Sequence, residues 1–326
     1  MSKLNSGKQR YFIVGGAGFI GSHVVRRVIN NADLVTVFDN FTSGKEWHLG
    51  ENLNNPKLKI VKGDVKDLDH LAETMQGHDI VFHFASNPDI SKAATQPDID
   101  FWEGTYLTQN VLEAMRITNV KKLIYASGSG VYGDVGEVPV CEDQTPMLPV
   151  STYGASKLAG EALISAYSYM FEISAVACRF ANVVGPHQTH GVGYDFVRYL
   201  TQNPKQLKIL GNGTQSKSYI YVDDVVSALL LVADHQKTGF DFFNVATQDY
   251  LNVREIADLV VQRMGLNNVQ YIFSGGDRGW KGDVPIVRFD SSKIRALGWR
   301  NEKSTREALI SSVDSIILDV KNGKIS

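Results

Sequence analysis

The stretch YFIVGGAGFIGSH, residues 11–23, decides the fold of this chain. Its first four residues are apolar and suit a buried strand, and glycines follow at positions 15, 18 and 21 before a helix expected to begin near Ser22. Glycines at a strand-to-helix turn let backbone N–H groups and the helix N-terminus approach a pyrophosphate. A tight turn can also need glycine for structural reasons alone, so the motif by itself leaves both interpretations open.

Short β-rich runs alternate with helix-like segments through the first half of the chain. Such alternation predicts an α/β fold, a Rossmann-type doubly wound parallel sheet with helices on both faces. The pattern loosens after residue 182, and helices are expected near 223–233, 252–264 and 304–320. We expect a dinucleotide-binding domain over 1–180 and a smaller, mainly substrate-binding part over 181–326 that interleaves with it. The predicted strands cover residues 11–14, 34–38, 58–61, 79–84, 122–125 and 173–180.

The composition favours a small-molecule protein. Of 326 residues, 43% are hydrophobic, enough to bury a large core, and 33 basic residues against 35 acidic ones leave a net charge of -2. No charge excess exists that would gather nucleic acid or an anionic membrane, so the expected partners are small molecules or a second copy. Because the N-terminus is polar and no long apolar run is present, we expect that the protein is neither exported nor membrane-spanning.

The cysteines and histidines point away from disulfides and metals. Cys141 and Cys178 lie far apart without metal-ligand spacing, which fits a reducing cytoplasm. His187 and His190 lie in a presumed loop with no nearby acid or third histidine, so no metal site is expected.

An acid at the end of the second predicted strand strengthens the dinucleotide interpretation. Asp39 lies roughly 20 residues past the glycines, where the adenosine ribose hydroxyls are held. Asn40 and Phe41 follow it, and no arginine is present for a 2′-phosphate, so we predict NAD rather than NADP. Asp64 and the run 84–86 follow other strands at the ligand-binding edge of the sheet, although Asp64 alone could be a helix cap. The predicted cofactor-binding residues are Gly15, Gly18, Phe19, Ile20, Asp39, Asn40, Ser43, Asp64, Val65, Phe84, Ala85, Ser86, Tyr153 and Lys157.

A tyrosine and a lysine four residues apart supply candidate acid–base chemistry. On a helix, Tyr153 and Lys157 share one face. A phenol of pKa about 10 is a poor base at neutral pH, but a neighbouring ammonium favours the phenolate. Such a pair could also be an ordinary surface tyrosine and lysine, and it becomes specific only together with the glycine motif about 135 residues upstream.

These motifs resemble the extended short-chain dehydrogenase/reductase family, the nucleotide-sugar epimerases and dehydratases. The resemblance covers essentially the whole chain. It implies that Tyr153 is the acid and base at a sugar hydroxyl, that Lys157 tunes it and holds the nicotinamide ribose, and that a hydroxyl residue before VYG bonds the same sugar oxygen. The matching motifs are GGAGFIGSH, FDN, GDVKD, VFHFAS, ASGSGVYG, YGASK, RFANVVGP and YIYVDDV.

The segment ASGSGVYG, residues 126–133, contains two serines and no acid. In many family members the hydroxyl residue stands at the position of Gly128, whereas a variant places it one residue earlier, which favours Ser127. Ser129 is the second candidate, and short polar loops also use serine simply to bond backbone. Family dehydratases and decarboxylases carry acids where this chain has Ser129 and Gly130, so we expect hydride and proton exchange at one carbinol carbon.

The resemblance also nominates residues for the nucleotide diphosphate. Asn182 and Arg278 are candidates, and Lys217 replaces the usual arginine, which weakens a bidentate phosphate grip. Each has an ordinary alternative as a loop cap or a solvated surface charge. Gly104 replaces the family's usual asparagine before the next helix, which puts a proton relay there in doubt. The predicted substrate-binding residues are Asn87, Ser127, Ser129, Asn182, Lys217 and Arg278.

The sequence therefore predicts an NAD-dependent nucleotide-sugar 4-epimerase that acts through a transient 4-keto sugar. The alternatives are a C4 dehydrogenase or reductase that releases or uses the 4-keto sugar, and a non-catalytic NAD-binding protein, which would need neither Tyr153 nor Lys157. A homodimer is expected through helices near 105–118 and 153–171, unless both apolar faces bury on the sheet. The apolar positions behind this expectation are Leu107, Val111, Leu112, Leu158, Ala162 and Ala166.

Overall fold

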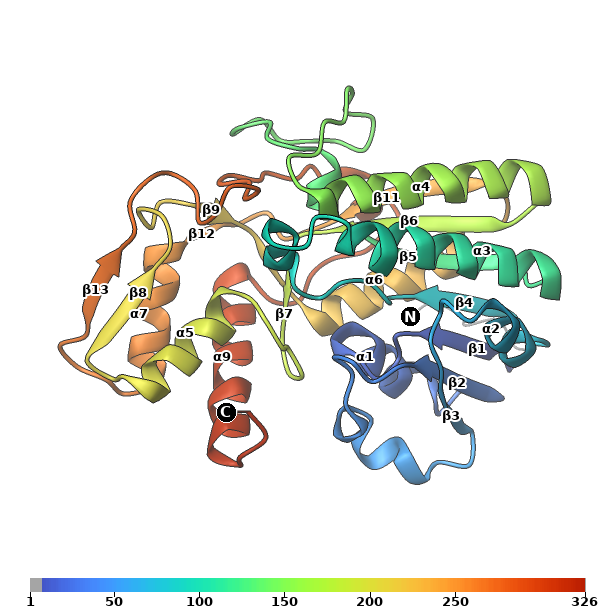
Figure 1. Cartoon of the computed structure of the whole chain (residues 1–326), viewed down its shortest axis with the longest axis horizontal. Helices are drawn as coiled ribbons and strands as arrows, with labels where there is room; N and C mark the ends of the chain where they lie inside the picture. The colour runs from blue at the N-terminus through green and yellow to red at the C-terminus, as the bar shows by residue number, and fades with distance from the viewer. Residues whose placement is uncertain (1–7, 326) are drawn as a thin grey trace. The chain divides into compact units, whose positions relative to one another are not determined.

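The computed structural model describes residues 8–325, and the central element of this part of the chain is a seven-stranded sheet (Figure 1). The strand order is β11-β6-β5-β4-β1-β2-β3, and the paired strands with assigned register are parallel. The order changes direction between β1 and β4, which creates the switch point where open α/β sheets bind ligands. The predicted doubly wound sheet is confirmed. The strands are β1 Arg10–Val14, β2 Leu34–Asp39, β3 Leu58–Lys62, β4 Ile80–His83, β5 Lys122–Gly128, β6 Ser174–Phe180 and β11 Phe240–Val245.

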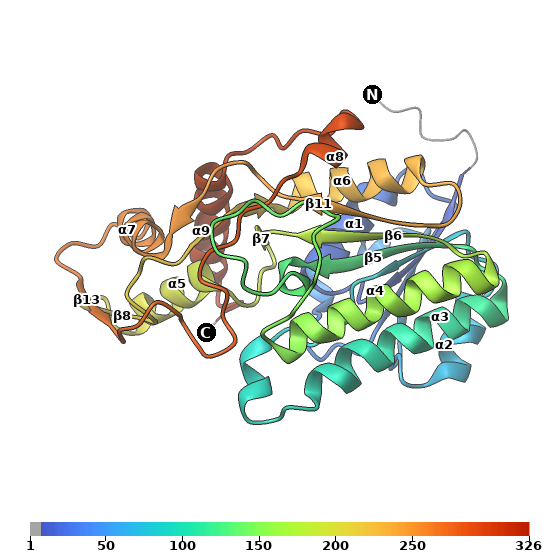
Figure 2. The same ribbon diagram turned by 90° about the horizontal axis from the view of Figure 1, so that it is seen from above.

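Helices cover both faces of the sheet. Figure 2 shows α2 Leu68–Met75, α3 Tyr106–Thr118 and α4 Thr152–Phe171 on one face, and α1 Phe19–Val28 and α6 Val222–His235 on the other. A π-helical turn, Phe101–Thr105, leads into α3. Four short 3-10 turns complete this part of the chain, at Glu46–His48, Gly50–Asn54, Ile90–Ala94 and Ser129–Val131. The core between sheet and helices includes Phe12, Val14, Phe38, Val111, Leu112 and Ile164.

Strand β11 is the strand of the seven-stranded sheet that sequence patterns missed. Its backbone continues the sheet beside β6, where Ala175 N–H donates to the Gly239 carbonyl at 2.8 Å. The run FDFFNV follows a stretch of loops and helices, and its pairing with β6 depends on contacts far apart in sequence. Periodicity within a short window does not reveal such a strand.

The chain forms two compact units. The first contains the sheet and comprises residues 8–131, 152–179 and 226–243, and the second comprises residues 132–151, 180–225 and 244–325. The chain passes between the two units five times, and one of these passages lies next to residue 180, the predicted boundary. Residues 132–151 of the predicted first domain belong to the second unit, and residues 226–243 of the predicted second part belong to the first unit. Each unit is described by itself below.

The second unit is built from four helices and three short strand pairs. α5, α7 and α9 pack on a common apolar core, and capping boxes start α7 at Asn252 and α9 at Ser304. No helix among residues 8–325 is both long and apolar enough to cross a membrane. The strand pairs are β7 Asn182–Val184 with β10 Tyr219–Tyr221, β8 Gln206–Ile209 with β13 Gln270–Phe273, and β9 Ser216–Lys217 with β12 Leu251–Asn252. The helices are α5 Val192–Gln202, α7 Val253–Arg263, α8 Ser292–Ala296 and α9 Thr305–Lys321.

Candidate active site

The turn from β1 to α1 has the geometry of an anion-binding loop. Gly15 has a left-handed φ of +77°, and a Cβ built there would lie 2.8 Å from the backbone nitrogen of Ala85, so the close approach of β1 and β4 requires glycine. Gly18 is the N-cap of α1, no side chain in residues 8–325 caps it, and the first turn has no acid. The uncapped N–H groups and the positive end of the helix dipole fit the pyrophosphate of a dinucleotide.

Asp39 lies at the end of β2 and is oriented by this turn. Its Oδ2 accepts a hydrogen bond from Ala17 N–H at 2.9 Å, and its Oδ1 accepts one from Phe41 N–H at 2.8 Å. Burial raises the pKa of Asp39, and the two backbone donors act in the opposite direction. Each carboxylate oxygen keeps a further lone pair, so this side chain can also accept from ribose hydroxyls.

The other predicted cofactor residues follow β2, β3 and β4. Asn40 is exposed and accepts from Thr42 N–H, and Asp64 is exposed and accepts from Lys66 N–H. The N-cap of α2 is Asp67, so Asp64 is not the cap of that helix. Partly exposed cofactor candidates are Phe19, Ile20, Ser43, Phe84, Ala85 and Ser86, whereas Val65 is buried.

Tyr153 and Lys157 lie one turn apart at the start of α4. The Lys157 ammonium lies 5.5 Å from the centroid of the Tyr153 ring and 5.1 Å from that of Tyr125. Lys157 is only 4% exposed, and its Nζ donates to the Ala126 carbonyl at 2.8 Å. This contact fixes the lysine between the helix and the end of β5.

Burial dominates the proton affinities of this pair. It raises the pKa of Tyr153 to about 12, although a hydrogen bond from Ser86 lowers it and the charge of Asp100 raises it further. Burial lowers the pKa of Lys157 to about 8, against the opposing charges of Asp100 and Glu161. The phenol is therefore neutral at pH 7 without a ligand, and additional positive charge is needed to favour the phenolate.

Ser127 belongs to a buried polar network. Its Oγ donates to Glu161 Oε1 at 2.6 Å, and Arg179 forms an ion pair with the same carboxylate, Nη2 to Oε2 at 2.7 Å. Glu161 lies one turn after Lys157 on the same face of α4, as its spacing in the sequence predicts, but it is buried and not on the surface. Because the Ser127 hydroxyl has one proton, it can only accept a further hydrogen bond while it donates to Glu161.

Residues 128–130, which follow Ser127, are half-buried. Ser129 is half-buried and begins a 3-10 turn. A Cβ built on Gly128 would meet no atom of residues 8–325 within 4 Å outside its immediate chain neighbours. The position where the family usually carries a hydroxyl residue therefore has room for one.

Asn87, predicted to bind substrate, is buried and already engaged. Its Nδ2 donates to Asp100 Oδ1 at 2.8 Å and to the Asp89 carbonyl at 2.9 Å. Asp100 was not predicted as a site residue, because an isolated acid before a helix forms no recognisable motif.

In the second unit, the predicted cations are both ion-paired. Lys217 Nζ lies 2.6 Å from Asp283 Oδ1, and Arg278 Nη2 lies 2.5 Å from Asp134 Oδ2. Asn182 is exposed at the start of β7. Asp283 and Asp134, which were not predicted from the sequence, hold the two cations in place within this unit.

Arg288 is a further cation of the second unit that was not predicted from the sequence. The Arg288 guanidinium carbon lies 4.0 Å from the Tyr250 ring centroid, and its Nη1 donates to the Ser216 carbonyl.

No group of three or more His, Cys, Asp or Glu side chains within residues 8–325 could hold a metal ion.

A glycine-rich turn at the switch point and a Tyr–Lys pair on α4 together define the class of dinucleotide-dependent short-chain dehydrogenases and reductases. Within this class, the model of the NAD dependent epimerase/dehydratase family matches residues 11–246, and the chain belongs to that family.

The comparisons with known proteins include epimerases and a dehydratase. A putative UDP-glucose 4-epimerase of Methanocaldococcus jannaschii is 32% identical over 91% of this chain and 95% of its own length. The crystal structure of a UDP-galactose 4-epimerase matches with a TM-score of 0.85 and 35% identity over 95% of this chain and 99% of that one. DesIV, a dTDP-glucose 4,6-dehydratase from Streptomyces venezuelae with NAD and TYD bound, matches with a TM-score of 0.89 and 25% identity over 97% and 99% of the two chains.

Proposed function

We propose that this protein is an NAD-dependent nucleotide-sugar 4-epimerase that acts through a transient 4-keto sugar. The observation that carries the proposal is the state of the carboxylates around Tyr153 and Lys157. Asp100 and Glu161, the two acids whose charges act on Lys157, each already accept hydrogen bonds from neighbouring side chains. Dehydration or decarboxylation needs a further acid–base group, whereas exchange at C4 needs only one.

The relatives support a uridine nucleotide. The epimerases similar to this chain include ones named for UDP-glucose, UDP-galactose and UDP-N-acetylglucosamine, and we propose a UDP-sugar as substrate. Asn87, Asn182, Lys217 and Arg278 are the proposed substrate contacts, and Ser129 is kept as an alternative to Ser127. The ion pairs of Lys217 and Arg278 would have to share these cations with the diphosphate.

In this proposal, each site residue of the first unit has a role in cofactor binding or proton transfer. The turn at Gly15 and Gly18 binds the pyrophosphate, and Asp39 accepts from the adenosine ribose. Tyr153 takes the proton from the sugar O4 as C4–O4 becomes a carbonyl, and returns it after the sugar has turned. Lys157 holds the nicotinamide ribose and favours the phenolate, while the Ser127 hydroxyl turns its proton from Glu161 to the sugar O4 and donates a hydrogen bond there. When bound, NAD supplies the hydride acceptor and donor.

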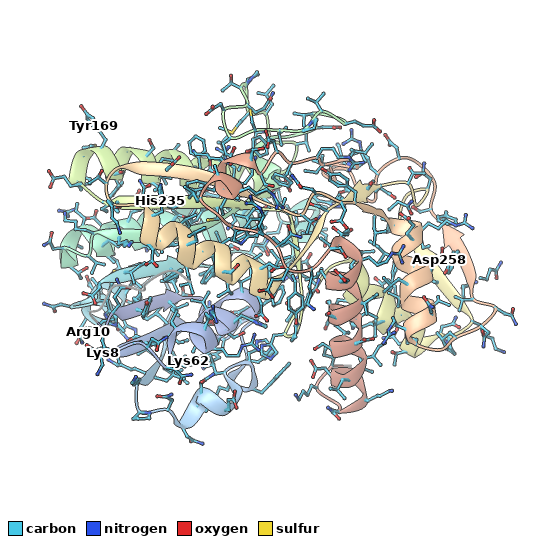
Figure 3. The ribbon with its side chains drawn as sticks, turned by 180° about the vertical axis from the view of Figure 1, so that it is seen from behind. Lys8, Arg10, Lys62, Tyr169, His235 and Asp258 are labelled. Carbon is cyan, nitrogen blue, oxygen red and sulfur yellow. The ribbon has the colours of Figure 1, made fainter. Side chains whose placement is uncertain are left out.

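We also propose a homodimer formed mainly through α4. Leu107, Val111 and Leu112 of α3 are buried within the chain, whereas Ala162 and Ala166 of α4 are exposed. Near the end of the same helix Tyr169 is 92% exposed and projects outward (Figure 3). Light scattering at micromolar concentration should give twice the chain mass, and a monomer would contradict the proposal.

A cytoplasmic location completes the proposal. The two cysteines support it, because Cys141 and Cys178 are both free thiols in the structure. A reducing compartment keeps thiols in this form.

The test of the proposed function is a turnover assay without added cofactor. Purified protein should contain bound NAD and interconvert UDP-glucose and UDP-galactose. A dehydrogenase would instead consume added NAD and accumulate a 4-keto sugar, and a non-catalytic NAD-binding protein would convert nothing.

A further inference from the structure

The buried carboxylate of Asp100 connects two segments of the first unit. Asp100 is only 1% exposed and immediately precedes the π-helical turn that leads into α3. Its Oδ1 accepts from Asn87 Nδ2 at 2.8 Å, and its Oδ2 accepts from Thr152 Oγ1 at 2.7 Å. Asn87 follows β4 and Thr152 is the first residue of α4, so one side chain ties the two segments together.

The chain neighbours of these two partners are themselves in contact. Ser86 precedes Asn87, Tyr153 follows Thr152, and the Ser86 side chain hydrogen-bonds the Tyr153 phenol. Asn87 is fixed further, because its N–H donates to the Glu103 carbonyl at 3.0 Å. A shift of either segment would therefore alter the Ser86–Tyr153 contact.

Asp100 also acts electrostatically on Tyr153 and Lys157. It raises the pKa of both Tyr153 and Lys157, which favours the neutral phenol and the charged ammonium. The other titratable groups around them are Glu161, Tyr125 from β5, and His83 from β4. His83 is buried with a pKa lowered to about 3, so it is neutral, and Glu161 is paired with Arg179. Among residues 8–325, no cationic side chain forms a salt bridge with Asp100, so its carboxylate is held by the hydrogen bonds from Asn87 and Thr152.

We propose that Asp100 is a positioning residue for Tyr153: its carboxylate holds the Ser86 segment and the start of α4 together, so that the Ser86 hydroxyl and the Tyr153 phenol stay in hydrogen-bond contact. The consequence for turnover rests on the proposed epimerase function, in which Tyr153 carries the O4 proton. The same carboxylate also sets the pH at which Tyr153 loses its proton.

Two substitutions separate the hydrogen bonds of Asp100 from its charge. Asp100→Asn keeps both bonds, since the amide oxygen accepts from Asn87 and the amide nitrogen donates to Thr152 Oγ1, but it removes the charge. Asp100→Ala removes both. The exposed Asp98 lies two residues earlier, and Asp98→Asn is the matched control for loss of one negative charge.

In the epimerase assay, Asp100→Ala should lower kcat about 10²-fold, a loss typical of a misplaced reacting group, with KM changed less than about threefold. Asp100→Asn should retain kcat within about threefold on the pH plateau and move the acid limb of kcat/KM to lower pH, because removing a negative charge lowers the pKa of Tyr153. Ser86→Ala should resemble Asp100→Ala. Asp98→Asn should leave kcat, KM and the pH profile of kcat/KM unchanged. Equal losses in both Asp100 variants with an unmoved pH profile would overturn the proposal, as would two variants indistinguishable from the control.

A second readout does not depend on turnover. In protein labelled with ¹³C at tyrosine Cζ, the resonance lost in Tyr153→Phe identifies Tyr153, and its titration should move to lower pH in Asp100→Asn but not in Asp98→Asn. An unmoved titration overturns the assignment of Asp100. If the wild-type protein shows no epimerase activity, the proposed function fails, and this titration still decides the role of Asp100. Should Asp100→Ala not fold, Thr152→Val removes one of the two hydrogen bonds and should lower kcat without a shift of the pH profile.

Discussion

The Lys157 ammonium lies 5.5 Å from the centre of the Tyr153 ring, one turn along α4. The lysine is held in this place by the Ala126 carbonyl, so its charge is fixed relative to the phenol. With a pKa lowered to about 8, Lys157 is still mostly charged at pH 7. Together with the positive charge of oxidised nicotinamide, it favours the phenolate that burial alone would disfavour.

Tyr153→Phe should reduce turnover by at least about 10³-fold, because it removes the group that carries the O4 proton. Binding of NAD should be nearly unchanged, since Asp39 and the glycine turn hold the adenosine half. Steady-state kinetics and the NAD content of the purified variant check both parts. Retention of more than a small fraction of activity would rule out Tyr153 as the acid–base group.

Lys157→Met should lower both turnover and cofactor retention, since one ammonium has two tasks. The measurement is the NAD released on denaturing equal amounts of wild-type and variant protein. Lys92→Met, on an exposed residue of the same unit, is the control and should behave as wild type. Unchanged NAD content in Lys157→Met would contradict the contact with the nicotinamide ribose.

Asp39 should make the protein select NAD over NADP. Its carboxylate would repel a 2′-phosphate, so NAD should bind at least about tenfold more tightly, a difference of about 1.4 kcal/mol. Calorimetry on cofactor-free protein measures the affinities for NAD and NADP. In Asp39→Ala, the ratio of these two affinities should be smaller than in the wild-type protein. Equal affinities in the wild-type protein would refute the prediction.

Ser127→Ala should cost roughly 10²–10³ in kcat, by analogy with loss of a hydrogen-bond partner at a developing oxyanion, while Ser129→Ala should cost much less. Adding Gly128→Ser to Ser127→Ala should restore part of the activity, because position 128 has open space and is where the family usually carries its hydroxyl. Kinetics of the three variants test this order. The reverse order of the two alanine variants would assign the role to Ser129.

The Glu161–Arg179 pair should matter for stability. Arg179→Met leaves a buried carboxylate without its cation and should reduce the free energy of unfolding by about 3–5 kcal/mol, whereas replacing both residues with apolar ones should recover much of the loss. Urea unfolding measures the difference. The exposed Arg263–Asp314 pair is the control, and Arg263→Met should have a far smaller effect. Similar losses at the two sites would contradict the buried-pair explanation.

The sequence predicted six of the seven sheet strands, because local hydrophobic patterns and the glycine turn identify them without knowledge of their partners. It did not predict β11, whose place beside β6 depends on contacts distant in the chain. The same limit applies to the site. Tyr153 and Lys157 are visible as a motif, whereas Asp100 acts through Asn87 and Thr152, which only folding brings within hydrogen-bond distance.

The most direct test of the central claim follows the hydrogen at C4. Purified protein without added NAD is incubated with UDP-galactose that carries deuterium at C4, and the UDP-glucose formed is analysed by mass spectrometry and NMR. A 4-epimerase that returns the same hydride should give UDP-glucose with the deuterium still at C4. Release of a 4-keto sugar, with the deuterium left on the bound cofactor and no UDP-glucose formed, would contradict the account and identify a C4 oxidoreductase.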